Sequence, residues 1–556
     1  MPNCSQCQSS FEILPEDRRF YEKMAPTIGG KTFPLLDPID CPYCRQMNRM
    51  VYRNFRSLYH RNCDLTGKSI IAMYDKDAPF PVYDYDTWHS DKWNPMKYGR
   101  DYDSSHPFLE QYKAFSDTVP RYNIHNNQCE NCRYSNFSFA SKDCYLVFGC
   151  VMNERCYFGH IVWESEQCFD CLYAYRCKYC YECVDCVDCY ELFFSQECVA
   201  CTSSTFLYDC RNCKNCFGCV GLNNKQYHIF NQPYSKDEYE KRIAELQFLS
   251  PQIQTVVQQR MQDLKLKHVH PHFVGSYNEN VSGNHVYYSK NVHYSFDAKQ
   301  CEDAKYLYTA SNTKDCHDIS FNGGISLELA YNSLTLFSCQ NIIVNHATSN
   351  CFNAYYSEFC FDCEHIFGCN GLKYKKYCIL NKQYSQEEYE RLILEIIESM
   401  VKDDTWSRFF PISHSPFAYN ESVAQEYQPL TQEQCLEKGR RWKEDLSVKS
   451  YKGPLYSIPE RIQDVQDDIL EAILICEVTG KPYKLIPQEL QFYRDHHLPI
   501  PRVHSDERHL RRMRMRNPRK LWNRVCAKCE KPIQTTYSSD RLETVTCEAC
   551  YLKTVY

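Results

Sequence analysis

The stretch "CKYCYECVDCVDCY", residues 177 to 190, places five cysteines at intervals of three. Around it the cysteines recur with a period of twelve, in three series: Cys132, Cys144, Cys156, Cys168 and Cys180; Cys177, Cys189, Cys201 and Cys213; and Cys186, Cys198 and Cys210. The segments between them are short, rich in Tyr, Phe and Val, and bounded by Asn, Asp or Gly, which is typical of strands and turns. A short fixed period with strand content predicts a β-solenoid, in which each coil stacks on the one below. The period fits either one tight coil of twelve residues or half of a wider coil.

A second copy of this pattern lies 150 residues further along the chain. The segment "CFGCVGLNNKQYHIFNQPYSKDEYEKR" (216–242) matches "IFGCNGLKYKKYCILNKQYSQEEYERL" (366–392). When the two copies are aligned at this offset, most cysteines of the first copy that are missing from the second are replaced there by small or apolar residues. Examples are Leu327 for Cys177, Ala330 for Cys180 and Leu336 for Cys186. A metal ligand is not usually replaced by leucine, whereas a packing position often is. We therefore interpret the central thiols as a packed ladder inside the solenoid.

Two other interpretations of the central cysteines stay open. The first copy holds 18 cysteines between residues 129 and 219, and the pairs Cys168/Cys171 and Cys210/Cys213 have the spacing of metal ligands. Disulfides are the other interpretation, which a reducing compartment disfavours. The N-terminal residues lack the basic and apolar regions of a secretory signal, so we expect a cytoplasmic protein.

Each solenoid ends in the same helix signal. In "YSKDEYEKR" and "YSQEEYERL", Ser235 and Ser385 precede Glu238 and Glu388 by three residues. This is the capping-box pattern, in which the serine accepts a hydrogen bond from the third amide and the glutamate reaches back. We expect a helix after each solenoid that covers its open end, as terminal caps do in repeat proteins.

The two ends of the chain carry a second duplication. "FEILPEDRRFYEK" (11–23) resembles "YKLIPQELQFYRD" (483–495), and "RMVYRNFRSLYHRNC" (49–63) aligns with "RMRMRNPRKLWNRVC" (512–526). Paired cysteines accompany both copies: Cys4, Cys7, Cys41 and Cys44 at one end, and Cys526, Cys529, Cys547 and Cys550 at the other. Two C-x-x-C knuckles close a tetrahedral site, so each end predicts a zinc-ribbon module with one Zn2+, about two per chain. Four thiolates leave no open position for catalysis.

Each terminal copy also keeps the remains of the other copy's site. In the N-terminal copy, the positions of Cys526 and Cys529 are occupied by Cys63 and Thr66. In the C-terminal copy, the positions of Cys4, Cys7, Cys41 and Cys44 are occupied, in that order, by Cys476, Thr479, His504 and Glu507. We interpret both as decayed sites, although Cys476 and His504 could retain weak metal affinity.

A row of basic residues accompanies each module. The N-terminal arginine row is Arg45, Arg49, Arg53 and Arg56, and the C-terminal basic row is Arg508, Arg512, Arg516, Arg519 and Lys520. The first row recurs at helical spacing and would form one face of a helix. An arginine-rich helix on a zinc module predicts a phosphate-binding surface, so we favour nucleic acid as the partner, with RNA or the ribosome slightly ahead of DNA. The arginines also fit a protein interface, or pairing with acidic residues of the same chain.

The remaining features exclude several classes of function. The net charge is −6, so no global field directs the protein to nucleic acid or to a membrane. Apolar runs such as "AILIC" (472–476) are too short to span a bilayer. "CDLTGKS" (63–69) ends like a phosphate-binding loop, but Asn62 stands where the first glycine is required. We expect a non-catalytic, zinc-stabilised scaffold that associates with nucleic acid. The alternative is a protein-binding or self-assembling scaffold, including an oligomer, that uses the solenoid faces.

The expected fold class is mainly β with α: two tandem β-solenoids with helical caps, flanked by duplicated zinc-ribbon modules. The expected boundaries are 1–128 for the N-terminal zinc module, 129–232 for the first solenoid, 233–279 for a helical connector, 280–383 for the second solenoid, 384–445 for a helix and a Pro- and aromatic-rich strap, and 446–556 for the C-terminal zinc module.

Several segments resemble a family of zinc-ribbon proteins found in small-genome candidate-phyla bacteria. They are "CPYCRQMNRMVYRNFRSLYHRNCDLTGKSI", "HPFLEQY", "NCFGCVGLNNKQYHIFN", "SPFAYNESVAQEY" and "ETVTCEACY", which together span nearly the whole chain. The resemblance implies a bacterial, cytosolic zinc protein, and it carries no established activity.

Overall fold

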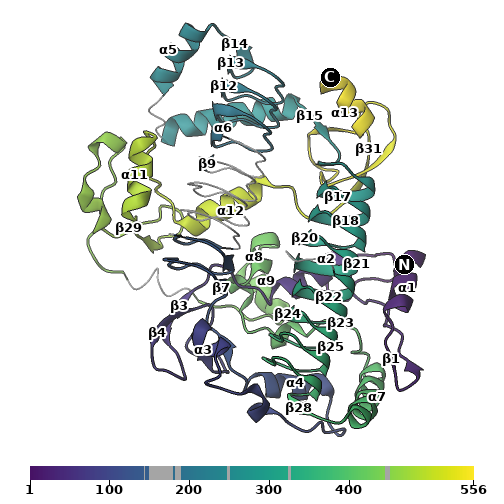
Figure 1. The fold of residues 1–556 in the computed structure, drawn as a ribbon. Coiled ribbons are helices and arrows are strands. Elements are labelled where there is room, and N and C mark those ends of the chain that lie inside the picture. The colour runs from purple at the N-terminus through teal and green to yellow at the C-terminus, as the bar shows by residue number, and fades with distance from the viewer. Residues whose placement is uncertain are drawn as a thin grey trace.

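The computed structural model describes residues 1–142, 144–148, 180–181, 190–246, 251–322, 327–444 and 451–555. Two β-solenoids run through the molecule, as the sequence predicts (Figure 1). The strands of the first solenoid are β7 (Asn126–Asn127), β8 (Ser138–Phe139), β9 (Cys180–Tyr181), β10 (Tyr190–Phe193), β11 (Thr202–Thr205), β12 (Lys214–Phe217), β13 (Gln226–Ile229) and β14 (Gln232–Pro233).

The second solenoid is longer in its described part. Its strands are β16 (Gly275–Ser276), β17 (Glu279–Tyr287), β18 (Lys290–Lys299), β19 (Glu302–Lys305), β20 (Tyr308–Ser311), β21 (Lys314–Asn322), β22 (Glu328–Phe337), β23 (Gln340–Ile343), β24 (His346–Ser349), β25 (Phe352–Tyr355), β26 (Glu364–Phe367), β27 (Lys376–Ile379) and β28 (Lys382–Gln383).

Most coils of both solenoids take twelve residues; in the second solenoid the first coil takes eleven, as Gly275 pairs with Val286, and the coil from Cys316 to Ala330 takes fourteen. The residues that lie side by side in parallel register are Tyr190, Thr202, Lys214 and Gln226 in the first solenoid, and Phe352, Glu364 and Lys376 in the second. Of the two interpretations of the sequence period, the tight coil is therefore confirmed.

Each coil is built from triplets of residues. A non-glycine residue with a φ angle near +50° recurs at every third position, for example Asn291, Tyr294 and Asp297. The residue that follows each of them is buried in the solenoid axis, as Val292, Ser295 and Ala298 are. Left-handed backbone is costly for most residues, and Asn and Asp tolerate it best. A spacing of three between inward positions also explains why cysteines are spaced by three in the sequence.

The inward cysteines and serines make the same hydrogen bonds. The Cys198 thiol donates to the Gln196 carbonyl oxygen at 3.3 Å, and the Ser295 hydroxyl donates to the His293 carbonyl oxygen at 2.9 Å. In return, Cys201 Sγ accepts from the amide of Cys213, one coil further on, at 3.5 Å. The thiols therefore satisfy backbone groups that face the axis, in addition to filling space.

All cysteines in the described part of the chain are free thiols, most of them buried. Burial raises the pKa of Cys301 to about 11, which keeps that thiol protonated at neutral pH. The stretch at residues 177–190 lies outside the described residues, apart from the strand at Cys180 and Tyr181 and from Tyr190, which begins β10. So do the predicted ladder positions Cys156 and Cys168, together with Cys171, which has the spacing of a metal ligand to Cys168.

Helices follow both solenoids, as predicted. They are α5 (Lys236–Leu246) after the first solenoid and α7 (Gln386–Lys402) after the second. The hydroxyls of Ser235 and Ser385 each accept a hydrogen bond from the amide three residues later at 3.3 Å, which is the capping box. A second helix, α6 (Pro251–Lys267), then leads through β15 (Val269–Pro271) into the second solenoid.

Short hairpins and helices form the two ends of the chain. The elements before the first solenoid are α1 (Pro15–Met24), β1 (Thr27–Ile28), β2 (Lys31–Thr32), α2 (Pro42–Met50), β3 (Tyr59–Asn62), β4 (Ser69–Ala72), β5 (Val82–Tyr83), α3 (Tyr85–His89), α4 (Phe108–Ser116) and β6 (Arg121–Tyr122). Those after α7 are α8 (Val423–Tyr427), α9 (Gln432–Glu437), β29 (Leu474–Ile475), β30 (Pro482–Tyr483), α11 (Pro487–Asp495), α12 (Ser505–Met515), β31 (Trp522–Val525), β32 (Pro532–Thr535), β33 (Thr544–Thr546) and α13 (Glu548–Val555).

The apolar cores explain how these ends are attached. One core fills the axis of each solenoid. A larger core lies outside the axis, where Met50 of the N-terminal module, Tyr331 of the second solenoid and Ile396 of α7 belong to one buried cluster. The C-terminal module is attached elsewhere, because β33 pairs in parallel with β15 at the entrance to the second solenoid. None of the helices in the described ranges is long and apolar enough to cross a bilayer.

Candidate metal centres

Four thiols of the N-terminal module lie together and form the N-terminal cysteine group. The sulfur atoms of Cys4, Cys7, Cys41 and Cys44 all lie within 4.8 Å of one another, and Cys7 Sγ is 3.8 Å from Cys41 Sγ. A tetrahedral zinc ion with Zn–S bonds of about 2.3 Å holds its sulfur atoms about 3.8 Å apart. The group therefore has the donor atoms and the dimensions of a zinc site.

The C-terminal cysteine group has the same dimensions. The sulfur atoms of Cys526, Cys529, Cys547 and Cys550 lie within 4.8 Å of one another, and those of Cys529 and Cys547 are 3.6 Å apart. The backbone forms a tight knuckle at the first pair, since the Cys526 amide donates to the Lys531 carbonyl oxygen at 2.8 Å. The amide of Cys547 donates to Cys526 Sγ at 3.3 Å, a contact that favours a thiolate.

The second cysteine pair of each group begins a helix, which differs from the predicted second knuckle. Cys41 is the N-cap of α2, and Cys547 precedes α13. The first pair of each group lies on a hairpin knuckle: the Cys4 amide donates to the Ser9 carbonyl oxygen at 2.9 Å, as the Cys526 amide does to Lys531 in the hairpin of β31 and β32. The partial positive charge at a helix N-terminus favours thiolates, which suits metal ligands. Pro42 after Cys41 is the sequence signal for this helix start.

Cys63 begins a metal-free copy of the same hairpin. It lies between β3 and β4, and its amide donates to the Lys68 carbonyl oxygen at 2.8 Å, as Cys526 does to Lys531. Thr66 takes the place of the second cysteine, and its hydroxyl accepts from the Lys68 amide at 3.4 Å. The knuckle therefore keeps its backbone shape with one thiol.

Asp84 completes this metal-free copy at the start of α3. Its amide donates to Cys63 Sγ at 3.4 Å, in the same way as Cys547 and Cys526 interact. Its carboxylate accepts a hydrogen bond from the Thr87 amide at 3.1 Å. Asp84 and Thr87 lie at the positions of Cys547 and Cys550, which are likewise 21 and 24 residues beyond the first cysteine. The sequence carries no cysteine signal for this correspondence, because neither Asp84 nor Thr87 is a cysteine.

The second metal-free copy contains Cys476, whose amide donates to the Lys481 carbonyl oxygen at 3.0 Å. His504 begins α12, and its Nδ1 accepts from the Asp506 amide at 3.1 Å. Across the described residues, only the two four-cysteine groups bring three or more metal ligands together. The pair of Cys476 and His504 therefore has no third ligand there, and the described solenoid cysteines form no metal cluster.

The N-terminal arginine row does not form one helix face as predicted, because α2 ends at Met50 and Arg53 and Arg56 follow it. The first three arginines of the row contact the second solenoid. Arg45 Nε lies 3.0 Å and Arg49 NH1 lies 3.3 Å from carboxylate oxygens of Asp318, which is fully buried. The guanidinium carbon of Arg53 lies 3.5 Å from the centre of the Phe137 ring. Arg56 Nε donates to Asp506 at 3.2 Å and so joins the two terminal modules.

The C-terminal basic row also meets the second solenoid. Arg516 and Arg519 share the carboxylate of Asp297, with Arg519 Nε at 3.0 Å. Burial raises the pKa of Asp297, but the two arginines outweigh it, so that pKa lies well below its usual value. Arg508 pairs with Glu489 at 3.4 Å, and Arg512 is buried.

These contacts decide between the alternatives for the arginines. The structure shows pairing with acidic residues of the same chain, and phosphate binding by these arginines stays a prediction without structural support. Lys520 is exposed, and its ammonium nitrogen lies 5.2 Å from the centre of the Trp522 ring.

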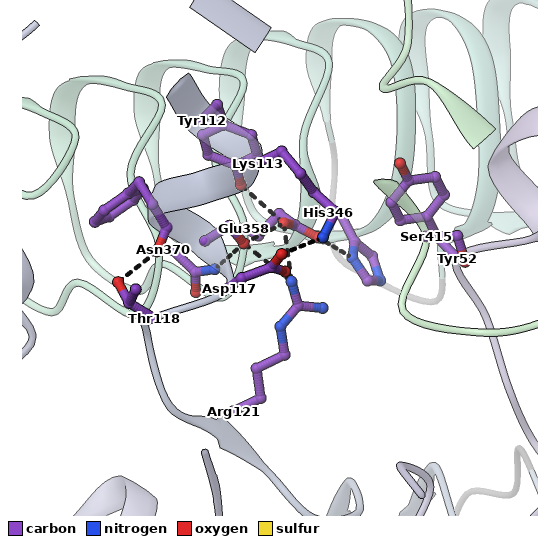
Figure 2. Close-up of polar contacts among 12 residues, drawn as sticks. Tyr52, Tyr112, Lys113, Asp117, Thr118, Arg121, His346, Glu358, Asn370 and Ser415 are labelled. Carbon is purple, nitrogen blue, oxygen red and sulfur yellow. Dashed lines mark hydrogen bonds and ion pairs between the residues drawn. The ribbon is translucent and has the colours of Figure 1, made fainter. Parts of the chain in front are cut away.

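A further buried network attaches α4 to the second solenoid, as Figure 2 shows. The Tyr112 hydroxyl donates to Glu358 Oε2 at 2.8 Å, and His346 Nδ1 lies 3.0 Å from Glu358 Oε1. Arg121 NH2 lies 3.6 Å from the same carboxylate. Burial raises the pKa of Glu358, but Arg121 and His346 outweigh it and hold that pKa at about 2.

The eight predicted metal ligands are thus brought together as two groups, whereas the carboxylates that hold the arginines were not predicted. Asp297, Asp318 and Glu358 each lie on the outside of a coil, where a sequence pattern shows only a polar corner residue. Asp297 and Asp318 occupy left-handed positions of the triplet repeat, whereas Glu358 does not, so the repeat gives a signal for the two aspartates alone.

No family model matches the sequence, and no curated protein is similar to it. One similar solved structure is described as an acetyltransferase from Desulfovibrio desulfuricans G20. It is 9% identical with a TM-score of 0.09, and the match covers 42% of this chain and 63% of that chain. A likeness this low carries no argument about fold or activity.

Proposed function

We propose that this protein is a non-catalytic scaffold, stabilised by two zinc ions, that associates with nucleic acid. One observation supports the scaffold role: arginines of both terminal modules form ion pairs with aspartates of the second solenoid, Asp318 and Asp297. Removing one partner of a buried ion pair leaves an uncompensated charge, at a cost of about 3–5 kcal/mol. Each module is therefore bound to the solenoid by contacts that are costly to lose.

A metal ion in the N-terminal cysteine group would also position the arginines that pair with Asp318. Cys41 and Cys44 lie in or beside the first turn of α2, and Arg45 and Arg49 follow in that helix. A zinc ion in the N-terminal cysteine group would fix the start of α2 and thereby aim its arginines at Asp318. Both groups supply four thiolates, which supports a structural role for the metal.

The proposed partner rests on the exposed part of the C-terminal module. Lys520 is exposed beside Trp522, and Arg514 is exposed at the end of α12. Exposed cations beside an aromatic ring suit a nucleic-acid strand, whose phosphates and bases they can meet together. RNA or the ribosome remains slightly favoured over DNA.

The test compares an exposed cation with an internal one in the full-length protein. We expect Lys520→Ala to weaken binding of a single-stranded RNA, measured by fluorescence anisotropy at 50 mM salt, with no change in the melting temperature. Arg516→Ala should lower the melting temperature by several degrees and leave the RNA affinity of the folded protein unchanged.

Three results would contradict the proposal. Absence of RNA binding at low salt would remove the nucleic-acid partner, as would a partner complex that survives both nuclease and high salt. Weaker RNA binding by Arg516→Ala at unchanged stability would mean that the arginines contact phosphate and do not hold the modules in place.

A further inference from the structure

A cavity of about 1030 Å³ lies where four parts of the molecule meet. Its walls come from residues 194–211 of the first solenoid, from α6, from the first coils of the second solenoid and from the C-terminal module. These parts are far apart in sequence but converge at the upper end of the molecule in Figure 1. The volume is at the upper end of the range for small-molecule sites, about 300–1000 Å³.

Fixed contacts hold these walls in place. β15, beside α6, pairs with β33 of the C-terminal module. Asp209 of the first solenoid accepts from the Tyr551 hydroxyl of α13 at 2.8 Å and lies 2.8 Å from His268 Nε2. The cavity is therefore part of the folded architecture and does not depend on a loose loop.

The lining carries cations without carboxylate partners. Lys265, Arg211 and Arg514 line the cavity, and none of them makes a salt bridge within the described residues. The closest partners of the Lys265 ammonium are the Gln196 side-chain oxygen at 3.4 Å and the centre of the Tyr208 ring at 4.1 Å. Burial lowers the pKa of Lys265 to about 8, because desolvation outweighs the attraction of the neighbouring Glu197 and Glu543 carboxylates.

Most lining carboxylates, in contrast, are already paired. Asp209 has the two partners given above, Glu197 lies 3.3 Å from His285, and Glu543 pairs with Arg541. Glu548 is the exception within the described lining, and it is exposed at the start of α13. The groups left to meet a ligand are therefore mainly positive, which favours an anion.

The mouth of the cavity also offers aromatic faces. Tyr277 and Tyr288 line it and stack on each other, with ring centres 4.8 Å apart and planes at 10°. They remain 76% and 55% exposed, so most of the Tyr277 ring faces solvent. The cavity therefore combines stacked aromatic rings with cations that make no salt bridge among the described residues. Single-strand binding proteins use aromatic rings and cations together to bind bases and phosphates.

We infer that this cavity binds a ligand that carries both a planar base and a phosphate, either a free mononucleotide or the end of a single nucleic-acid strand. Lys265 meets the phosphate, and Tyr277 and Tyr288 stack with the base. The strand form rests on the nucleic-acid partner proposed above, whereas the mononucleotide form is independent of it.

The experiment titrates the full-length protein with AMP and UMP by isothermal titration calorimetry, and with a ten-nucleotide RNA by anisotropy. Tyr277→Ala and Lys265→Met should each weaken binding by at least about fivefold, because stacking or a phosphate contact is lost. Tyr374→Ala is the matched control: Tyr374 is 77% exposed on the second solenoid and does not line the cavity. It should leave the affinity unchanged.

The outcomes separate this inference from the proposed function. RNA binding that depends on Lys520 but not on Tyr277 or Lys265, with no mononucleotide binding, would overturn the cavity site and leave the scaffold standing. Mononucleotide binding that Tyr277→Ala weakens, without any RNA binding, would support the cavity and contradict the nucleic-acid partner. Because Tyr277 is exposed, Tyr277→Ala should fold, and it tests the cavity even if Lys265→Met does not fold.

Discussion

The residues with positive φ at the corners of the solenoid coils have different roles, which depend on what lies next to their side chains. Each triplet of the solenoid needs one residue with positive φ, and aspartate and asparagine tolerate that conformation best. Where such a corner faces solvent, the side chains bond to one another along the stack, as Asn291 donates to Asp303 at 2.9 Å. Where a terminal module covers the corner, the same residue type holds arginines, as Asp297 and Asp318 do.

At the residue scale we predict that Asp297→Asn destabilises the protein by about 3 kcal/mol, because Arg516 and Arg519 lose their shared counter-charge. Asp303→Asn is the control, an exposed corner of the same solenoid with no arginine partner, and it should change the stability by less than about 0.5 kcal/mol. Chemical denaturation of both variants measures the difference. Equal effects would mean that the buried pairs add nothing to stability.

The pH dependence of Asp297 follows from the sign of its shift. Its pKa in the folded protein lies well below the ordinary value of 3.8, so the unfolded state binds the proton more tightly. The stability that this carboxylate contributes is complete above about pH 4 and is lost as the pH falls below that value. In acid denaturation, wild type and Asp297→Asn should therefore converge below pH 4. Parallel curves throughout would contradict the shift.

At the scale of the element, thiols and hydroxyls are interchangeable along the solenoid axis. Cys351 donates to the carbonyl oxygens of Ser349 at 3.3 Å and Cys360 at 3.4 Å, bonds that a serine can also make. We predict that Cys351→Ser costs less than about 1 kcal/mol. Cys351→Leu overpacks the axis and should cost about 1–3 kcal/mol. Neither variant should change the metal content, and a drop in metal with Cys351→Ser would show that the axis binds an ion.

The metal-free hairpin around Cys63 gives a second prediction at this scale. Its backbone already has the shape of the C-terminal knuckle, so the triple change Thr66→Cys, Asp84→Cys and Thr87→Cys should create a third four-thiolate site. Mass spectrometry of the native protein should show one more zinc ion than wild type, while Thr66→Cys alone should show none. An unchanged metal count in a folded triple variant would contradict the correspondence between the two modules.

At the scale of the whole molecule, the sequence predicts the features that repeat along the chain, and it does not predict the contacts between residues that are far apart in sequence. The twelve-residue coil, the capping serines and the two groups of four cysteines all follow from spacing along the chain. The burial of Arg49 does not, because its partners Asp318 and Asn332 are more than 260 residues away. A cluster of arginines looks the same in sequence whether it faces phosphate or carboxylate. The cavity is missed for the same reason, since its walls come from four separate parts of the chain.

The central claim is that sulfur in the middle of the molecule fills space and satisfies backbone groups, while sulfur near the two ends holds metal. The measurement that tests it most directly is the metal content of the full-length protein, purified without chelator, determined by plasma mass spectrometry against protein concentration from amino-acid analysis. We expect two zinc ions per chain, one for each four-cysteine group. Six or more metal ions per chain would place metal among the solenoid cysteines, and a metal-free folded protein would remove the terminal sites; either result would contradict the central claim.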